Sequence, residues 1–240
     1  MLPATPPRLP IVAIDGPAGA GKSTVARQLA LRLGLSMIDT GAIYRSVALA
    51  ARRAGIDWED DAGLQRLLEA PPGLGLSFLP VADQDVGQRV LLHGHDVTEG
   101  IRTPEISRGS SVVSARPVVR ARLLGLQRQL GLTAPRGAVL EGRDIGTVVF
   151  PDAAVKFFLT ASDEARARRR FDELSEKGLS VTLADVLADQ RRRDRDDTER
   201  AIAPLKAAAD AMLVDTTGLD LRQVLDRCDA HARQRLAQLA

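Results

Sequence analysis

The sequence predicts an α/β fold with a mainly parallel central sheet between two layers of helices, and three observations predict it. Apolar runs of four or five residues, too short for helices, recur along the chain. Stretches whose apolar residues repeat every three or four positions, as in amphipathic helices, separate these runs. A glycine-rich turn joins the first run, Ile11 to Ile14, directly to such a helix. Alternation of this kind places helices on both faces of one sheet.

The first half of the chain follows the alternation and then departs from it. Helices are expected to stop at Gly34, at Gly55 and at Pro71-Pro72-Gly73, because glycine and proline end helices. Two strand-like runs joined by the turn-rich residues 82–87 then predict a small β insert. In order, the sequence predicts strand 11–14, helix 22–33, strand 35–38, helix 42–53, acidic helix 57–70 and strands 74–78 and 88–92.

The second half returns to alternating helices and strands. Two expected helices open with a proline, which suits the first helical turn, and Ser162 is placed to cap a third. In order, the sequence predicts helices 104–115 and 117–130, strands 138–141 and 155–159, helix 162–177, a helix from Thr182 into the arginine-rich stretch 191–200, strand 212–214 and a last helix from Leu221.

Composition describes an ordinary globular domain and excludes several classes of protein. The chain has 240 residues, of which 45% are hydrophobic and 27% charged, enough for one well-packed domain. The net charge of +2 and the aromatic content of 3% argue against a nucleic-acid-binding protein. No run approaches the ~20 apolar residues of a membrane span. The single cysteine, Cys228, and a first segment too proline-rich for a signal peptide favour the cytoplasm.

The turn after the first strand carries the motif Gly16-x-x-x-x-Gly21-Lys22-Ser23. Between a strand and a helix, this motif is a phosphate-binding loop of the Walker A type. Its backbone N–H groups and the helix N-terminus cradle a polyphosphate. Lys22 is expected to reach the β- and γ-phosphates and Ser23 to bind Mg²⁺ with ATP. The alternative, a glycine-rich turn without a ligand, is disfavoured because strand, spacing and helix are all present.

Further polar clusters follow the second and third core strands, Asp39 to Arg45 and Glu141 to Thr147. Strand ends of this kind meet at the ligand-binding edge of an α/β sheet. Arg45 is expected to hold a second phosphate, although a plain helix start capped by Thr40 also fits. Asp15 and Asp39 can either orient water on Mg²⁺ or cap backbone. Arg166, Arg169 and Arg170 share one expected helical face, and Arg193, Asp197 and Arg200 share another. From spacing alone, a solvated ion-pair ladder is favoured for both faces.

Five motifs in order resemble the bacterial cytidylate kinases, the (d)CMP kinases of the nucleoside monophosphate kinase group. They are Gly16-Pro-Ala-Gly-Ala-Gly-Lys-Ser-Thr24, Asp39-Thr-Gly-Ala-Ile-Tyr-Arg45, Asp96-Val-Thr98 with Ile101-Arg102, Gly142-Arg-Asp-Ile-Gly-Thr147 and Arg193-Asp-x-x-Asp-x-x-Arg200-x-x-x-Pro204-Leu205. The likeness spans about residues 11–215. His93-Gly-His95 departs from the family pattern, and two histidines alone make a weak metal site.

The resemblance implies a P-loop kinase of three layers, α/β/α, organised as a single domain. It implies a core of about 8–39, 131–161 and 205–240, a monophosphate-binding part of about 40–130 that holds the β insert, and a short helical lid with arginine-rich helices at about 162–204. It also implies transfer of the ATP γ-phosphoryl group to CMP or dCMP, with Mg²⁺, by a monomer without nucleic-acid or membrane partners.

Site residues follow from the resemblance, position by position. ATP is expected at Gly16, Pro17, Ala18, Gly19, Ala20, Gly21, Lys22, Ser23 and Thr24. The CMP phosphate is expected at Arg45, Arg143 and Arg193, with Thr40 and Tyr44 beside it. The cytosine is assigned to Ser111, Arg120 and Asp144, and the sugar side to Asp197 and Arg200. Arg169 and Arg170 are expected near the transferring phosphoryl group, so that Lys22, Arg143, Arg193, Arg169 and Arg170 form the catalytic set.

Two other functions remain open from the residues. One is a P-loop kinase for a different nucleoside monophosphate or small acceptor. The other is a GTP-dependent switch, which the sequence disfavours because guanine readers use Asn-Lys-x-Asp and this chain contains no asparagine.

Overall fold

A five-stranded parallel sheet forms the centre of the protein in the computed structural model, which describes residues 9–71, 73–80, 88–176 and 178–238. Its strands lie in the order β2-β6-β1-β7-β8. They are β1 (Ile11–Asp15), β2 (Ser36–Asp39), β6 (Ala138–Glu141), β7 (Val155–Thr160) and β8 (Met212–Asp215). β1 therefore lies in the middle, paired with β6 on one side and β7 on the other.

Each face of the sheet is covered by a different set of elements. On one face, Val12 and Ile14 pack against Leu29 of α1 (Lys22–Leu33) and Val224 of α8 (Leu221–Ala237). On the other face, the core includes Ile145 in the π-helical turn η2 (Ile145–Val149) and reaches α5 (Pro117–Leu132). The predicted three layers are present, and on the second face the π-helical turn packs beside α5.

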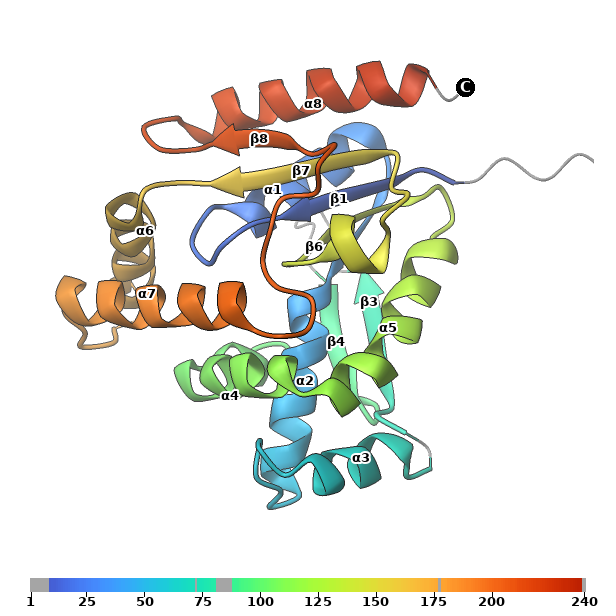
Figure 1. Ribbon diagram of the computed structural model, residues 1–240, viewed down its shortest axis with the longest axis vertical. Helices are drawn as coiled ribbons and strands as arrows, with labels where there is room; N and C mark the ends of the chain where they lie inside the picture. The colour runs from blue at the N-terminus through green and yellow to red at the C-terminus, as the bar shows by residue number, and fades with distance from the viewer. Residues whose placement is uncertain (1–8, 72, 81–87, 177, 239–240) are drawn as a thin grey trace, which may run out of the picture.

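A helical part with the β insert lies beside the sheet, below it in Figure 1. It contains α2 (Thr40–Arg53), α3 (Asp61–Glu69), α4 (Pro104–Ala115), α5 and the 3₁₀ turn η1 (Gly100–Arg102), which share one hydrophobic cluster. The insert is the antiparallel sheet β3-β4-β5, made of β3 (Leu76–Pro80), β4 (Gln88–Leu92) and β5 (His95–Asp96). The predicted turn at 82–87 lies outside the described residues.

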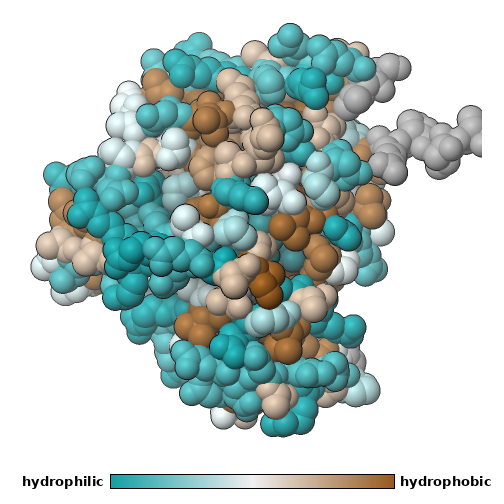
Figure 2. Space-filling model, in the orientation of Figure 1, coloured by the Kyte–Doolittle hydropathy of each residue, from teal (hydrophilic) through white to brown (hydrophobic). Residues whose placement is uncertain are grey.

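Two helices, α6 (Asp163–Glu176) and α7 (Leu183–Glu199), project to the left of the sheet in Figure 1 and pack on each other through a small apolar cluster. The surface over the middle of α7 is hydrophilic, whereas apolar atoms are exposed at the left end of this projecting part (Figure 2). In the part of the chain that the structure describes, no helix combines the length and apolar character needed to cross a bilayer. The phosphate loop, between β1 and α1, lines one cavity together with residues of α2, η1, α6 and α7.

The expected helices and strands are confirmed with shifts of a few residues at their ends. The largest shift is at α3, which begins at Asp61 rather than near residue 57 because Asp60 accepts the backbone N–H of Gly63 and caps the helix there. Three short elements were not predicted: β5, η1 and η2. The predicted cap Ser162 does accept a backbone N–H, from Ala165, and Thr182, at the predicted start of α7, accepts the N–H of Asp185.

Candidate active site

The phosphate loop runs from the end of β1 to the start of α1. At Gly16, φ is 146° and a Cβ would lie 2.0 Å from the carbonyl oxygen of Leu159, so a side chain has no room. The loop curls so that the Lys22 ammonium donates to the carbonyl of Pro17 at 2.7 Å. The uncapped start of α1 therefore faces the same space as Lys22, the arrangement that binds phosphate.

Two cavities, of about 470 Å³ and about 200 Å³, share the walls around this loop. Lys22, Arg45 and Arg193 line both. The larger cavity also has Arg169 and Arg170 in its wall. The smaller cavity is lined by every residue that the sequence predicts for the acceptor nucleotide except Ser111: Thr40, Tyr44, Arg45, Arg120, Arg143, Asp144, Arg193, Asp197 and Arg200.

Carboxylates of the chain itself partner the arginines of the smaller cavity. Arg45 pairs with Asp39 at 2.6 Å, and Arg143 pairs with Asp197 at 2.8 Å. Although burial raises the pKa of Asp197, the Arg143 and Arg193 guanidinium groups outweigh it and hold that pKa below its usual value. The Asp197 carboxylate thus stays ionised and offsets part of the positive charge of the cluster.

Several buried donors in this cluster nevertheless lack a hydrogen-bond partner. Within the described residues, the orphaned nitrogens include Nε of Arg45, Nε of Arg193 and Nη2 of Arg200. Buried donors are rarely left unpaired in native proteins, and exceptions point to a missing partner. The three donors come from three predicted contacts of the acceptor nucleotide, so an oxygen-rich anion in this cavity would satisfy them.

Burial and mutual repulsion also lower the pKa values of the cations. Burial, with the nearby Arg143, lowers the pKa of the Lys22 ammonium to about 7. Burial, again with Arg143, lowers the pKa of Arg193 to about 10. Each shift reflects the cost of burying a positive charge, increased by the neighbouring arginine, and a bound polyphosphate opposes it by supplying negative charge.

The far end of the smaller cavity has a different chemistry. Asp144 is buried, and its Oδ2 accepts a short hydrogen bond from Arg120. Its Oδ1 lies 3.8 Å from Arg200, too far for a hydrogen bond. Burial raises the pKa of Asp144, while Arg120 and Arg200 oppose the shift. Arg120 also lies 5.7 Å from the centre of the Tyr44 ring. This end therefore offers a fixed hydrogen-bond acceptor beside an aromatic face.

A set of oxygen ligands suited to Mg²⁺ surrounds the predicted metal-binding hydroxyl. Ser23 donates to Oε2 of Glu141 at 2.8 Å, and Asp39 lines both cavities with them. Burial, followed by the nearby Asp39, raises the pKa of Glu141. A divalent cation favours oxygen ligands and would relieve this crowding of carboxylates. The residues present fit Mg²⁺ held with a nucleotide.

With the fold and cavities described, comparison with known proteins places the chain. The profile of the family described as "Cytidylate kinase" matches residues 12–234. Proteins named "Cytidylate kinase" from Citrifermentans bemidjiense and Geobacter sulfurreducens are 53% and 52% identical, over 95% and 94% of this chain and 94% and 93% of their own. The chain belongs to the cytidylate kinase family. At the level of fold, an uncharacterised protein from Eubacterium ventriosum covers 93% of this chain and 98% of its own with a TM-score of 0.51 and 11% identity.

In this member of the cytidylate kinase family, Arg169 and Arg170 of the predicted lid make contacts that their spacing in the sequence did not indicate. Arg169 donates to the backbone carbonyl of Thr216 at 2.7 Å and to its hydroxyl at 3.0 Å. Arg170 pairs with Glu173 at 2.7 Å along α6. Both arginines line the larger cavity with the phosphate loop. The first is tied to the segment after β8, whereas the second is held on its own helix.

One expectation is corrected by the contacts, and four residues predicted to bind a nucleotide do not line the cavities. The cap of α2 is Asp39, which accepts the N–H of Ala42 at 2.9 Å, and Thr40 instead donates to the carbonyl of Glu141 at 2.7 Å. Ser111 lines neither cavity; its neighbours one turn apart, Ser110 and Ser114, line the smaller one. In the loop, Gly16, Pro17 and Ala20 support the turn without lining either cavity.

The sequence left two roles open for Asp15, orienting water on Mg²⁺ or capping backbone, and its contacts are those of a backbone cap. Its two carboxylate oxygens accept the N–H groups of Ile145 at 2.8 Å and Gly146 at 2.7 Å. Backbone capping is therefore its observed role, and it lines neither cavity. His93 and His95 flank the turn between β4 and β5, where His93 adopts φ 50°. Within the described ranges, no three metal-type side chains gather.

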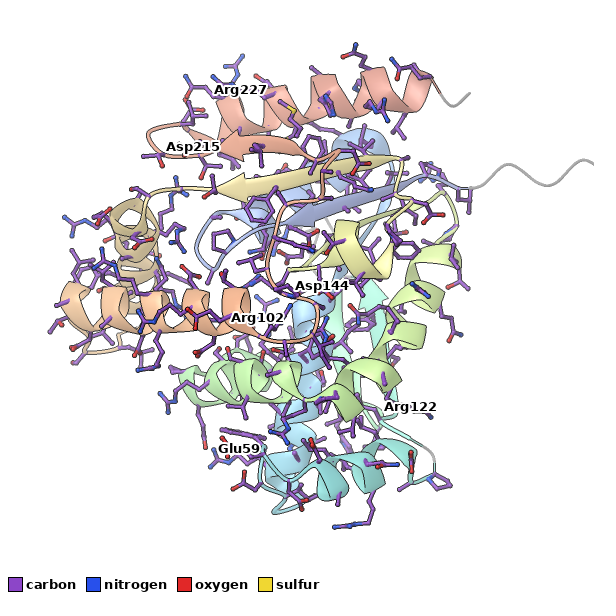
Figure 3. All side chains as sticks on the ribbon, in the orientation of Figure 1. Glu59, Arg102, Arg122, Asp144, Asp215 and Arg227 are labelled. Atoms are coloured by element: carbon purple, nitrogen blue, oxygen red, sulfur yellow. The ribbon has the colours of Figure 1, made fainter. Side chains whose placement is uncertain are left out.

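Glu141 and Arg102 are the main site residues that sequence reasoning left without a role. Glu141 ends β6 and contacts Ser23 across 118 residues of sequence, which no local pattern can reveal. Arg102 belongs to a motif that carried the resemblance, and it lines the larger cavity. Figure 3 shows Arg102 and Asp144 near the middle of the molecule, whereas Glu59 and Arg122 lie at its periphery. The position of Glu141 at a strand end was the signal that could have found it.

Proposed function

We propose that this protein is a Mg²⁺-dependent cytidylate kinase, which transfers the γ-phosphoryl group of ATP to CMP or dCMP and yields ADP with CDP or dCDP. Family membership supports the activity. One structural observation carries the assignment of the site: Lys22 and the arginines 45, 143 and 193 line a single cavity that ends at Asp144. We further propose that the protein acts as a monomer in the cytoplasm.

The proposed donor and acceptor meet at Lys22. ATP lies along the phosphate loop, and its terminal phosphate faces the cavity shared with Arg45 and Arg193. Mg²⁺, bound with ATP, neutralises charge on the β- and γ-phosphates. A nucleoside monophosphate has a second pKa of about 6, so its attacking oxygen is already deprotonated at pH 7. The protein therefore needs no general base; it aligns the oxygen and neutralises the spreading charge.

Base selection is proposed to reside in Asp144. Its Oδ1 can accept a hydrogen bond from the cytosine amino group, while Oδ2 stays bound to Arg120. Uracil presents a carbonyl at that position, which would leave two acceptors facing each other. A site built on such hydrogen bonds can discriminate by as much as ~10⁴. The helices α6 and α7 are proposed to close over the cleft, because open water competes as an acceptor.

An ADP-release assay with CMP, dCMP, UMP and AMP tests the function. We expect CMP and dCMP to be the best acceptors, and Lys22→Ala to lower kcat by about 10²–10³-fold because a fixed charge at the transferring group is lost. Lys206→Ala is the control, since Lys206 is exposed and lines neither cavity. Faster turnover of UMP or AMP would favour the alternative kinase for another acceptor. Slow single turnover with every monophosphate would instead favour a nucleotide-dependent switch.

A further inference from the structure

One buried carboxylate lies at the junction of the two proposed substrate sites but lines neither cavity. Asp15 is the last residue of β1 and directly precedes Gly16 of the phosphate loop. It is only 4% exposed, and its two oxygens accept the backbone N–H groups of Ile145 and Gly146. Burial raises the pKa of Asp15 to about 6, opposed by the two backbone N–H donors. Because an ionised carboxylate is costly to bury, a shorter apolar residue would be cheaper if only packing mattered.

The two N–H groups belong to the π-helical turn η2, which begins one residue after Asp144. The first N–H groups of any helical turn lack acceptors within the turn, and here the carboxylate oxygens of Asp15 are those acceptors. At the other end, Arg128 of α5 donates to the carbonyls of Val149 at 2.9 Å and Val148 at 3.1 Å. Side chains from two distant elements therefore hold both ends of η2. π-Helical turns are rare and occur mostly at functional sites.

We propose that Asp15 is a positioning residue for the acceptor site: by fixing the start of η2, it sets where Arg143 and Asp144 stand relative to the phosphate loop. Consecutive Cα atoms are 3.8 Å apart, so a shift of the clamped N–H groups passes directly to the two residues before them. A misplacement of about 1 Å can cost on the order of 10² in rate. The identity of the acceptor as CMP rests on the proposed function.

The same carboxylate also joins the donor site to the acceptor site. Its backbone leads into Gly16, which packs so closely on the Leu159 carbonyl that a Cβ has no room, while its side chain holds η2. The distance between the two proposed nucleotides is thus fixed by a group that touches neither. A merely stabilising role would predict a loss of folding stability without a selective effect on the acceptor.

Asp15→Asn separates these roles, because asparagine has the same shape but can accept only one of the two N–H groups and turns an NH₂ toward the other. We expect the KM for CMP to rise about tenfold and the CMP-over-UMP preference to fall, with the KM for ATP unchanged within about twofold. Asp220→Asn is the matched control: Asp220 accepts the N–H of Gln223 at 2.8 Å at the start of α8, away from both cavities.

A second variant keeps the test decisive if Asp15→Asn does not fold. Arg128 is exposed, so Arg128→Met leaves the core intact while it releases the other end of η2. We expect a smaller rise in the KM for CMP, about threefold, again without change for ATP. Arg122→Met, on the same helix and also exposed, is its control.

The outcomes distinguish the two proposals. If the wild-type protein fails to phosphorylate CMP, the proposed function is wrong. If the wild type is active but Asp15→Asn leaves the KM for CMP and the base preference unchanged, or raises the KM values for CMP and ATP equally, the positioning role is overturned. If only Arg128→Met can be purified, an unchanged KM for CMP overturns it.

Discussion

Asp144 shows how one side chain divides two tasks between its two oxygens. Oδ2 accepts from Arg120, whereas Oδ1 lies 3.8 Å from Arg200, too far for a hydrogen bond, so it can accept from a new donor. Because the carboxylate is buried, water competes little for its free oxygen, and a hydrogen bond to that oxygen is stronger than it would be in water. Arg120 fixes the orientation of the carboxylate, so the direction of the free oxygen is set before any nucleotide arrives.

Asp144→Ala is therefore expected to reduce the preference for CMP over UMP, because the acceptor for the cytosine amino group is gone. Ratios of kcat/KM for the two monophosphates, measured in one ADP-release assay, check this. A ratio equal to that of the wild type would refute the assignment. Asp144→Asn is an informative companion: its amide can rotate to donate to the uracil carbonyl, so we expect the preference to shift toward UMP without loss of volume.

Residues that carry a motif could be predicted from the sequence, while residues that act through distant contacts could not. The spacing of Gly16, Gly21 and Lys22 predicts a phosphate loop, and in the structure Lys22 lines a cavity, as such a loop requires. The pairing of Ser23 with Glu141, and that of Asp15 with Ile145, join segments more than a hundred residues apart. Such contacts depend on strand order, which no local pattern contains.

At the scale of elements, one buried guanidinium joins α6, α7 and the phosphate loop. Arg166 of α6 is 4% exposed and pairs with Asp194 of α7 at 2.5 Å. It also donates to the carbonyl of Ala18 in the loop at 3.0 Å. The proposed lid is thus anchored to the ATP site by a residue that lines neither cavity. The sequence placed Arg166 on a charged helical face but gave no sign that this face turns inward.

We expect Arg166→Met to lower the free energy of unfolding by about 2–4 kcal/mol, because it keeps the apolar stem but leaves Asp194 and a loop carbonyl without their donor. Denaturation with urea, followed by circular dichroism, measures the change. Arg168→Met, an exposed arginine two residues along the same helix, should stay within about 0.5 kcal/mol of the wild type. Equal losses for both variants would argue against the anchor.

Element length explains which parts of the secondary structure were predictable. Helices such as α1 and α4 span three turns, so their apolar spacing and their glycine or proline boundaries mark them clearly. By contrast, β5 has two residues, η1 three and η2 five, too few for a repeating apolar pattern to be recognised. These short elements form through tertiary contacts, such as the N–H groups of η2 with Asp15.

At the scale of the whole molecule, the α/β class and the alternation were predictable, but the strand order β2-β6-β1-β7-β8 was not. Alternation specifies parallel strands without saying which are neighbours. The order matters for function, because it places β1 beside β6 and so brings the phosphate loop next to Arg143 and Asp144.

Stability of the whole protein should depend on pH through the buried carboxyl of Asp15. Its pKa is raised from 3.8 to about 6, so this group contributes stability below pH 3.8 that is lost as the pH rises through 6. Asp15→Asn lacks this titration. The difference in unfolding free energy between variant and wild type should therefore move in favour of the variant by up to about 3 kcal/mol from pH 4 to pH 8. Urea denaturation of the nucleotide-free proteins at both pH values measures it, and a constant difference would contradict the prediction.

The pairing of Arg45 with Asp39 and of Arg143 with Asp197 has a consequence for turnover. A phosphorylated product must leave a site rich in arginine, and bare guanidinium groups would grip the extra negative charge and slow its departure. Asp39 and Asp197 already pair with these two arginines when the site holds no nucleotide. We therefore expect departure of the product to exchange one counter-ion for another at Arg45 and Arg143, which lowers the cost of release.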